Sequence, residues 1–173
     1  MTDWDEIVHR HGPEVWRTAY RLLGDHTEAE DCFQETFLDA LRLSRSRLVR
    51  HWSGLLRRLA TARAIDGLRR RIRRYAREST VDCDMLVGSK LQPADNAVAA
   101  ELSDRLRCAL SQLPDRAAEI FCLHALEGWS YAEVAAELGI SVDAVGVALH
   151  RARQQLQELL KPALAGRSGT EES

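Results

Sequence analysis

The sequence predicts an all-α protein made of two small helical domains joined by a linker, with a helix-turn-helix in the C-terminal domain. Residues that favour helices, above all Leu, Ala, Arg and Glu, are abundant, whereas only 4 prolines and 10 glycines occur among the 173 residues. Apolar residues also recur at helical spacing in several stretches that are separated by turn residues.

The first domain is predicted over residues 1–77 and contains three helices. The first covers about residues 3–23 and could break at Gly12-Pro13, because proline removes a backbone donor. The second runs from a capping box formed by Thr27 and Glu30 to about residue 44. Residues 44–52 read as a connector, and Ser53 is the expected cap of a long third helix that ends near residue 77.

Residues 78–96 lose helical periodicity and are predicted to be a linker. The second domain, residues 97–161, begins with a helix over about 97–112 and a second one with Pro114 in its first turn. Ser130 and Glu133 form the capping box of a short helix, and Ser141 caps a last helix to about residue 160. We expect Pro162 to end this helix, which leaves residues 162–173 as a flexible tail.

Charge is distributed in three blocks, although the formal net charge is only -2. Residues 1–41 hold 10 acids and 3 bases, residues 42–77 hold 13 arginines and one acid (Asp66), and residues 78–173 hold 15 acids and 8 bases. A basic block between acidic ones indicates a localised site for a polyanion. The acidic ends would suit a basic protein partner.

Most of the arginines in the basic block fall on the predicted third helix: Arg57, Arg58, Arg63, Arg69, Arg70, Arg71, Arg73, Arg74 and Arg77. Like charges on one helix repel each other unless a polyanion neutralises them, so we expect contact with nucleic acid rather than a merely solvated face. Trp52 at the head of the helix could stack on an unpaired base or pack in the core.

Residues 131–145 have the spacing of a helix-turn-helix, a unit that usually places its second helix in the DNA major groove. Ala135 is small enough for the helix crossing, Gly139 suits the turn, and Val145 is the apolar anchor. The positions expected to face DNA include an acid and apolar groups, which predicts weak reading of base sequence. They are Ser141, Asp143, Gly146, Val147, His150, Arg151 and Arg153.

Other classes of function find little support in the sequence. There is no apolar run of about 20 residues, and the acidic N-terminus lacks an apolar segment, so we expect a cytoplasmic protein that does not insert into a membrane. The four cysteines are widely spaced, which predicts reduced, mostly buried thiols and no metal site. No phosphate loop, nucleophile elbow or paired-acid site is present, so we expect neither an enzyme nor a cofactor.

Three stretches together resemble the extracytoplasmic-function sigma factors of bacterial RNA polymerase: residues 20–37, 55–70 and 113–153. The order and spacing of the three are more specific than any one of them. The resemblance implies a first domain that docks on polymerase and opens the promoter, and a second domain that binds upstream DNA. It also implies core RNA polymerase (β′ clamp and β flap), promoter DNA and an anti-sigma factor as partners.

The resemblance assigns roles residue by residue. Residues that match the segment docking on the β′ clamp are Glu30, Asp31, Gln34, Glu35 and Phe37. Those in the segment that melts and reads the minus-ten element are Trp52, Arg57, Arg58, Arg63, Arg69, Arg70, Arg73 and Arg74, with Asp66 expected to hold an arginine in place. The helix-turn-helix residues Ser141, Asp143, Val147, His150, Arg151 and Arg153 would contact the minus-thirty-five region.

Two departures from the family pattern stand out. Ala62 replaces a common asparagine, and residues 144–149 lack a hydroxyl and two cations that relatives carry. A stand-alone helix-turn-helix regulator is one alternative, but it leaves the acidic docking segment unexplained. A thiol or metal sensor built on the cysteines is another, but it lacks ligand spacing.

Overall fold

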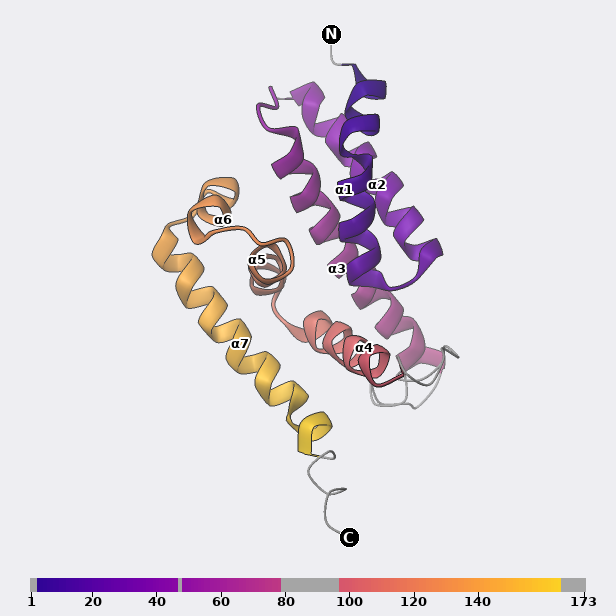
Figure 1. Ribbon diagram of the computed structural model, residues 1–173, viewed down its shortest axis with the longest axis vertical. Coiled ribbons are helices and arrows are strands. Elements are labelled where there is room, and N and C mark those ends of the chain that lie inside the picture. The colour runs from indigo at the N-terminus through magenta and orange to yellow at the C-terminus, as the bar shows by residue number, and fades with distance from the viewer. Residues whose placement is uncertain (1–2, 47, 79–96, 166–173) are drawn as a thin grey trace.

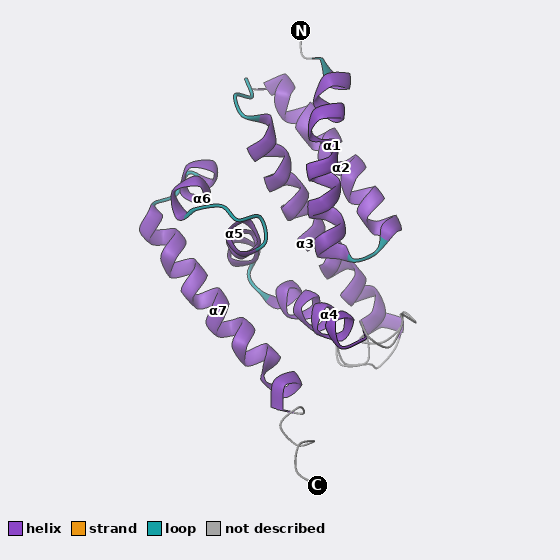
Figure 2. Ribbon diagram, viewed as in Figure 1, coloured by secondary structure: helices purple, strands orange, loops and turns teal. Residues whose placement is uncertain are grey.

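The structure is a computed structural model that describes residues 3–46, 48–78 and 97–165 (Figure 1). The described residues form seven helices and contain no strand (Figure 2). In chain order they are α1 (Trp4–Leu23), α2 (His26–Ser46), α3 (Trp52–Glu78), α4 (Ala97–Gln112), α5 (Asp115–Ala125), α6 (Tyr131–Leu138) and α7 (Val142–Ala165). The predicted fold class is confirmed, whereas residues 79–96 of the predicted linker lie outside the described residues.

The helices form two groups that touch each other. Helices α1, α2 and α3 pack side by side, and α4 and α5 lie against α3 (Figure 1). Helix α7 packs against α4, α5 and α6 and follows the outer side of the second group. Below, the N-terminal half means α1–α3 and the C-terminal half means α4–α7.

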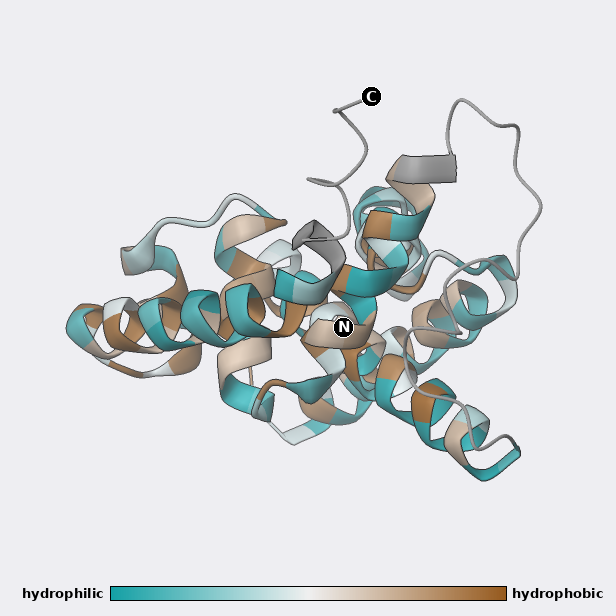
Figure 3. Cartoon of the chain, turned by 90° about the horizontal axis from the view of Figure 1, so that it is seen from below, coloured by the Kyte–Doolittle hydropathy of each residue, from teal (hydrophilic) through white to brown (hydrophobic). Residues whose placement is uncertain are grey.

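Hydrophobic side chains form three clusters. Such clusters are expected because the helices carry both hydrophobic and hydrophilic residues, as the hydropathy colouring in Figure 3 shows. One cluster lies within the N-terminal half around Val15 and Leu56, and another joins α5 to the helix-turn-helix around Val145 and Leu149. The third joins both halves, because it includes Leu68 of α3 together with buried residues of α4, α5 and α7. The sequence predicted two domains, but it did not predict that they share a core.

Local hydrogen bonds correct two predicted helix starts. Helix α2 begins before Thr27, because the carboxylate of Asp25 accepts the backbone N–H of Glu28 at 3.0 Å and caps the helix. Helix α3 begins at Trp52, and the hydroxyl of Ser53 donates to Glu14 at 2.9 Å instead of capping.

The three prolines among the described residues also differ from expectation. Pro13 lies inside α1 on its exposed side and does not end the helix, because the rest of α1 is fixed by packing on α2 and α3. Pro114 occupies the N-cap position of α5 rather than its first turn. Helix α7 continues past Pro162 to Ala165, so the predicted stop at Pro162 is wrong.

The cysteines differ in state. Cys32 and Cys122 are free and buried, as predicted, whereas Cys108 is disulfide-bonded, which contradicts the expectation of reduced thiols throughout. Cys83 lies outside the described residues. Burial disfavours the charged thiolate and raises the pKa of both Cys32 and Cys122 to about 12.

These raised pKa values predict inert thiols. At about pH 8 almost no thiolate is present at either site, so Cys32 and Cys122 should resist iodoacetamide in the folded protein and react once it is unfolded in guanidinium. Peptide mass spectrometry measures the modification of each cysteine. Rapid alkylation of either residue in the folded protein would contradict this account of their burial.

The core of the N-terminal half should be sensitive to cavities. Leu56 is fully buried between the first three helices, so Leu56→Ala is expected to lower the free energy of unfolding by about 3 kcal/mol. Leu38→Ala removes the same atoms from a side chain that is 50% exposed and should cost less than about 0.5 kcal/mol. Urea unfolding followed by circular dichroism measures the free energy of unfolding of both variants. Equal losses of this free energy would contradict the burial of Leu56 between the first three helices.

Candidate nucleic-acid and polymerase interfaces

One face of α2 carries exposed polar residues. Glu30, Asp31 and Gln34 all point to solvent within one turn of the helix, and Leu38, one turn further on, is 50% exposed. Glu35 does not join them, because its carboxylate lies 3.6 Å from a guanidinium nitrogen of Arg63 on α3. The structure therefore groups three of the five residues predicted for the docking segment. Glu35 turns toward α3, and Phe37 packs against the core of the N-terminal half.

Most of the predicted DNA-contacting arginines on α3 have carboxylate partners within the chain. Arg63 donates to Asp39 of α2 at 2.5 Å, and this hydrogen bond raises the pKa of the Arg63 guanidinium. Arg71 and Arg74 lie 3.4 and 3.7 Å from Glu28. An external polyanion is therefore not required to neutralise Arg63, Arg71 and Arg74, because acids of the protein itself pair with them.

Arg57 has the most enclosed partner. Its Nε donates to the carboxylate of Glu127 at 2.9 Å, and its Nη2 donates to the backbone carbonyl of the same residue at 2.7 Å. The Thr18 hydroxyl donates to the other carboxylate oxygen at 2.9 Å, and the Glu127 side chain is only 7% exposed. The Arg57 guanidinium also lies 5.4 Å from the ring centre of Trp129. Arg57 therefore contacts the C-terminal half both through the ion pair with Glu127 and through a cation–π interaction with Trp129.

Arg58 and Arg69 extend this contact along α3. Arg58 donates to Glu119 at 3.1 Å and lies 3.7 Å from the carboxylate of Glu137. Arg69 pairs with Asp115 and donates to the backbone carbonyl of Leu113 at 2.7 Å. We call the bonds that join Arg57, Arg58 and Arg69 to the C-terminal half the α3 interface.

The remaining predicted minus-ten residues are more accessible. The side chains of Arg70 and Arg74 are 57% and 59% exposed, and Arg73 is also exposed. Asp66 lies 4.0 Å from Arg69, as expected of a residue that holds an arginine in place. The predicted arginines thus divide into three groups. Arg57, Arg58 and Arg69 contact the C-terminal half, Arg63 pairs with α2, and the exposed ones are Arg70, Arg73 and Arg74.

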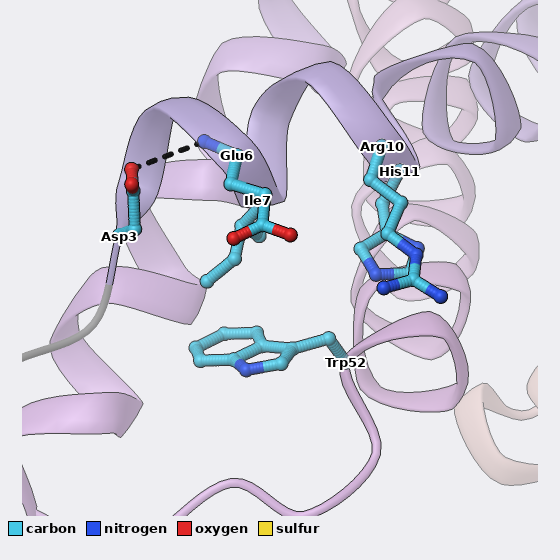
Figure 4. Close-up of a pocket in the computed structure, with 6 residues that line it drawn as sticks. All are labelled: Asp3, Glu6, Ile7, Arg10, His11 and Trp52. Carbon is cyan, nitrogen blue, oxygen red and sulfur yellow. Dashed lines mark hydrogen bonds between the residues drawn. The ribbon is translucent and has the colours of Figure 1, made fainter.

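Trp52 lies beside a cavity of about 300 Å³ at the junction of α1 and α3. Figure 4 shows its indole ring facing the first turns of α1, with Glu6, Ile7, Arg10 and His11 around the cavity. The ring is half-buried and makes an edge-to-face contact with Trp4 at 5.2 Å between ring centres. The ring therefore packs on one side and lines the cavity on another, and its contact with an unpaired base stays a prediction.

The predicted helix-turn-helix is formed by α6 and α7. Ser130 and Glu133 make both bonds of the capping box, and their hydrogen bonding lowers the pKa of the Glu133 carboxyl. Gly139 adopts a positive φ of 65° in the turn, where a side chain would be strained. Val145 is fully buried, as its role as an anchor requires.

The side of α7 that faces away from this core is open to solvent. Of the positions predicted to face DNA, Gly146 is half-buried against Tyr131, and the others are exposed: Ser141, Asp143, Val147, His150, Arg151 and Arg153. Within the described residues, no group of His, Cys, Asp and Glu could hold a metal ion. None of the described helices is long and apolar enough to cross a membrane.

Sequence reasoning missed the acids of the C-terminal half that meet α3. The net charge of the C-terminal block included these acids, but nothing in the sequence distinguished Glu119, Glu127 and Glu137 from the others. The sequence also carried no sign of the role of Arg107, which donates to the carbonyl of Leu22 at 2.9 Å. The only signal that could have found them is the excess of acids after residue 96, which matches the excess of arginines on α3.

Two family models match the chain. Residues 7–74 match the model described as Sigma-70 region 2, and residues 103–156 match the model described as Sigma-70, region 4. The first range contains α2 and most of α3, and the second contains the helix-turn-helix.

Several curated proteins are similar over most of the chain. The ECF RNA polymerase sigma factor SigE of Mycolicibacterium smegmatis is 36% identical over 92% of this chain, which spans 62% of that protein's length. SigM of Bacillus subtilis is 32% identical over 90% of this chain and 93% of its own length. SigL of Mycobacterium tuberculosis is 35% identical over 88% of each chain.

Solved structures show the same fold. CnrH in complex with the cytosolic domain of CnrY superposes with a TM-score of 0.55 at 26% identity, over 91% of this chain and 87% of that one. The sigma factor RpoE of Bartonella quintana, solved with the anti-sigma factor NepR, superposes with a TM-score of 0.54 at 24% identity, over 93% of this chain and 98% of that one.

Proposed function

Because the chain belongs to the extracytoplasmic-function family of RNA polymerase sigma factors, we propose that it binds core RNA polymerase and directs it to promoters, where it helps to open the DNA. The observation that carries this proposal is the presence in one chain of both a region 2 match and a region 4 match. The role is binding and positioning rather than bond chemistry, and its place is the cytoplasm, where the polymerase is.

The exposed face of α2 is the proposed polymerase-docking surface. Glu30, Asp31 and Gln34 present two charges and an amide to solvent, which suits a basic surface such as that expected of the β′ clamp. Leu38 adds an exposed apolar group next to them, and apolar groups at the centre of an interface supply much of its affinity. Glu35 would act indirectly, by holding Arg63 and Arg70 on α3.

The promoter-opening surface is proposed to combine Trp52 with the arginines of α3. Arginines neutralise phosphates, and the cavity beside Trp52 offers a flat ring, Arg10 and the carboxylate of Glu6 to an unpaired base. Unstacking a base costs a few kcal/mol, which such a pocket can offset.

Helix α7 is proposed to bind upstream DNA, with Arg151 and Arg153 on phosphates. Asp143 and Val147 at groove-facing positions offer no cation to the base edges, so we expect weak reading of the minus-thirty-five sequence. This half of the protein would lie near the β flap, and an anti-sigma factor is a further proposed partner. A stand-alone regulator would leave the region 2 match and the exposed face of α2 without a role.

Binding to core RNA polymerase tests the proposal. Asp31→Arg combined with Gln34→Ala should weaken binding at least about tenfold, because a like charge then meets the basic surface. Glu158→Arg with Gln154→Ala is the matched control, since it makes the same charge change on exposed positions of α7. Co-purification of labelled protein with core polymerase measures both.

We expect the wild type and the control to bind in equal proportion to polymerase. Absence of binding by the folded wild-type protein would refute the sigma assignment. Equal binding by all three proteins would place the docking surface elsewhere than on α2.

A further inference from the structure

We propose that the cavity beside Trp52 selects guanine as its unpaired base, and that Glu6 and Arg10 are the residues that recognise this base. The inference rests on the proposed function and names the base that this surface takes. The cavity has a volume of about 300 Å³ and lies between the first turns of α1 and the indole ring (Figure 4). Of the residues that the family resemblance places at the minus-ten element, only Trp52 lines it.

The cavity contains one free carboxylate and one free guanidinium. Within the described part of the chain, neither the Glu6 carboxylate nor the Arg10 guanidinium has a hydrogen-bond or ion-pair partner. The other polar side chains of the lining are engaged, because Asp3 accepts the backbone N–H of Glu6 at 3.2 Å and the His11 ring lies 3.8 Å from a carboxylate oxygen of Glu14. A ligand can therefore bind the two free groups without displacing another side chain.

The spacing of these two groups matches two adjoining edges of a base. Glu6 and Arg10 are four residues apart on α1, so they lie on one face of the helix with about 5–6 Å between their Cβ atoms. A carboxylate has two acceptor oxygens, and a guanidinium has a planar fork of donors. The pair therefore fits a base that carries two neighbouring donors next to two neighbouring acceptors.

Guanine is the base that meets this requirement. Its N1–H and N2 amino groups are neighbouring donors for a carboxylate, and O6 and N7 beside them are the acceptors that arginine binds as a pair. Cytosine and adenine each have an amino group flanked by a ring acceptor, and thymine places its only donor between two carbonyl oxygens, which a carboxylate repels. The cavity should therefore favour guanine most and thymine least.

The surroundings of the cavity suit a nucleotide that belongs to a strand. The Trp52 ring is held by its edge-to-face contact with Trp4, so it offers a fixed flat surface on which the base can stack. Arg50, two residues before Trp52, is exposed, so a cation is available to a neighbouring phosphate. The lining residues belong to α1, its N-cap and Trp52, so base selection can be tested on the free protein.

Binding of single-stranded DNA to the full chain tests this inference. The probes are four fluorescein-labelled strands of about 11 nucleotides that differ only in the central base of a thymine background. Fluorescence anisotropy at low salt gives each dissociation constant. We expect the strand with the central guanine to bind at least about tenfold more tightly than the all-thymine strand, because both charged groups donate to or accept from guanine.

Deoxyinosine tests the carboxylate contact, because it is deoxyguanosine without the N2 amino group. In the wild type, this replacement should weaken binding at least about fivefold, whereas in Glu6→Ala it should change the affinity less than about twofold. Asp5→Ala is the matched control, since it removes an equal charge from the same exposed first turn of α1 at a position outside the cavity. It should respond to deoxyinosine as the wild type does.

The base analogue 7-deazaguanine lacks the N7 acceptor and tests Arg10 in the same way. Its effect on affinity should be lost in Arg10→Ala and kept in Arg17→Ala, which removes an exposed arginine of α1 that does not line this cavity. All four substitutions are at exposed positions, and circular dichroism confirms that each variant keeps its helices.

Equal affinity for the four strands, a preference for another base, or no measurable binding of any strand would overturn the inference. Equal responses of Glu6→Ala and Asp5→Ala to deoxyinosine would also overturn it, because they would reflect a general effect of charge. The assay contains no polymerase. Failure of the sigma assignment, seen as absent polymerase binding by the wild type, is therefore distinguishable from failure of this inference.

Discussion

The carboxylate of Glu127 is almost removed from water, and it is held by Thr18 and Arg57 of the N-terminal half. A charge in such a place is tolerated only while its partners stay, since breaking one side of a buried pair leaves the other charge without compensation. The relative position of the two halves therefore depends on this contact, and so does the access of other molecules to the first turns of α3. Arg58 and Arg69 make further hydrogen bonds to the C-terminal half, so the interface extends along α3 beyond Arg57.

The helices and the helix-turn-helix were predictable because their signals are local: apolar periodicity, the Ser130–Glu133 capping box and the glycine at position 139. The starts of α2 and α3 were mispredicted, because Asp25 competes with Thr27 as a cap and Glu14 binds the Ser53 hydroxyl. The α3 interface joins residues far apart in the chain, and no local pattern encodes such pairs. Charge counting detected the imbalance between the blocks but not that the blocks neutralise each other.

The two surfaces that we propose read DNA differ in how exposed they are. The face of α7 is open to solvent but poor in cations, whereas α3 is rich in arginines, of which the N-terminal ones are engaged within the protein. The face of α2 that we propose docks on polymerase is exposed in the same structure.

The separation of the two halves is the most direct measure of this account, because the account makes it depend on the contact at Glu127. Donor and acceptor dyes at position 45 of α2 and position 157 of α7, both exposed, report the separation of the halves by energy transfer. The account predicts efficient transfer in the wild type and a clear fall in the folded variant Glu127→Arg, because Arg57 then faces a cation. Unchanged transfer in that variant would contradict the account, because the position of the halves would then not depend on Glu127.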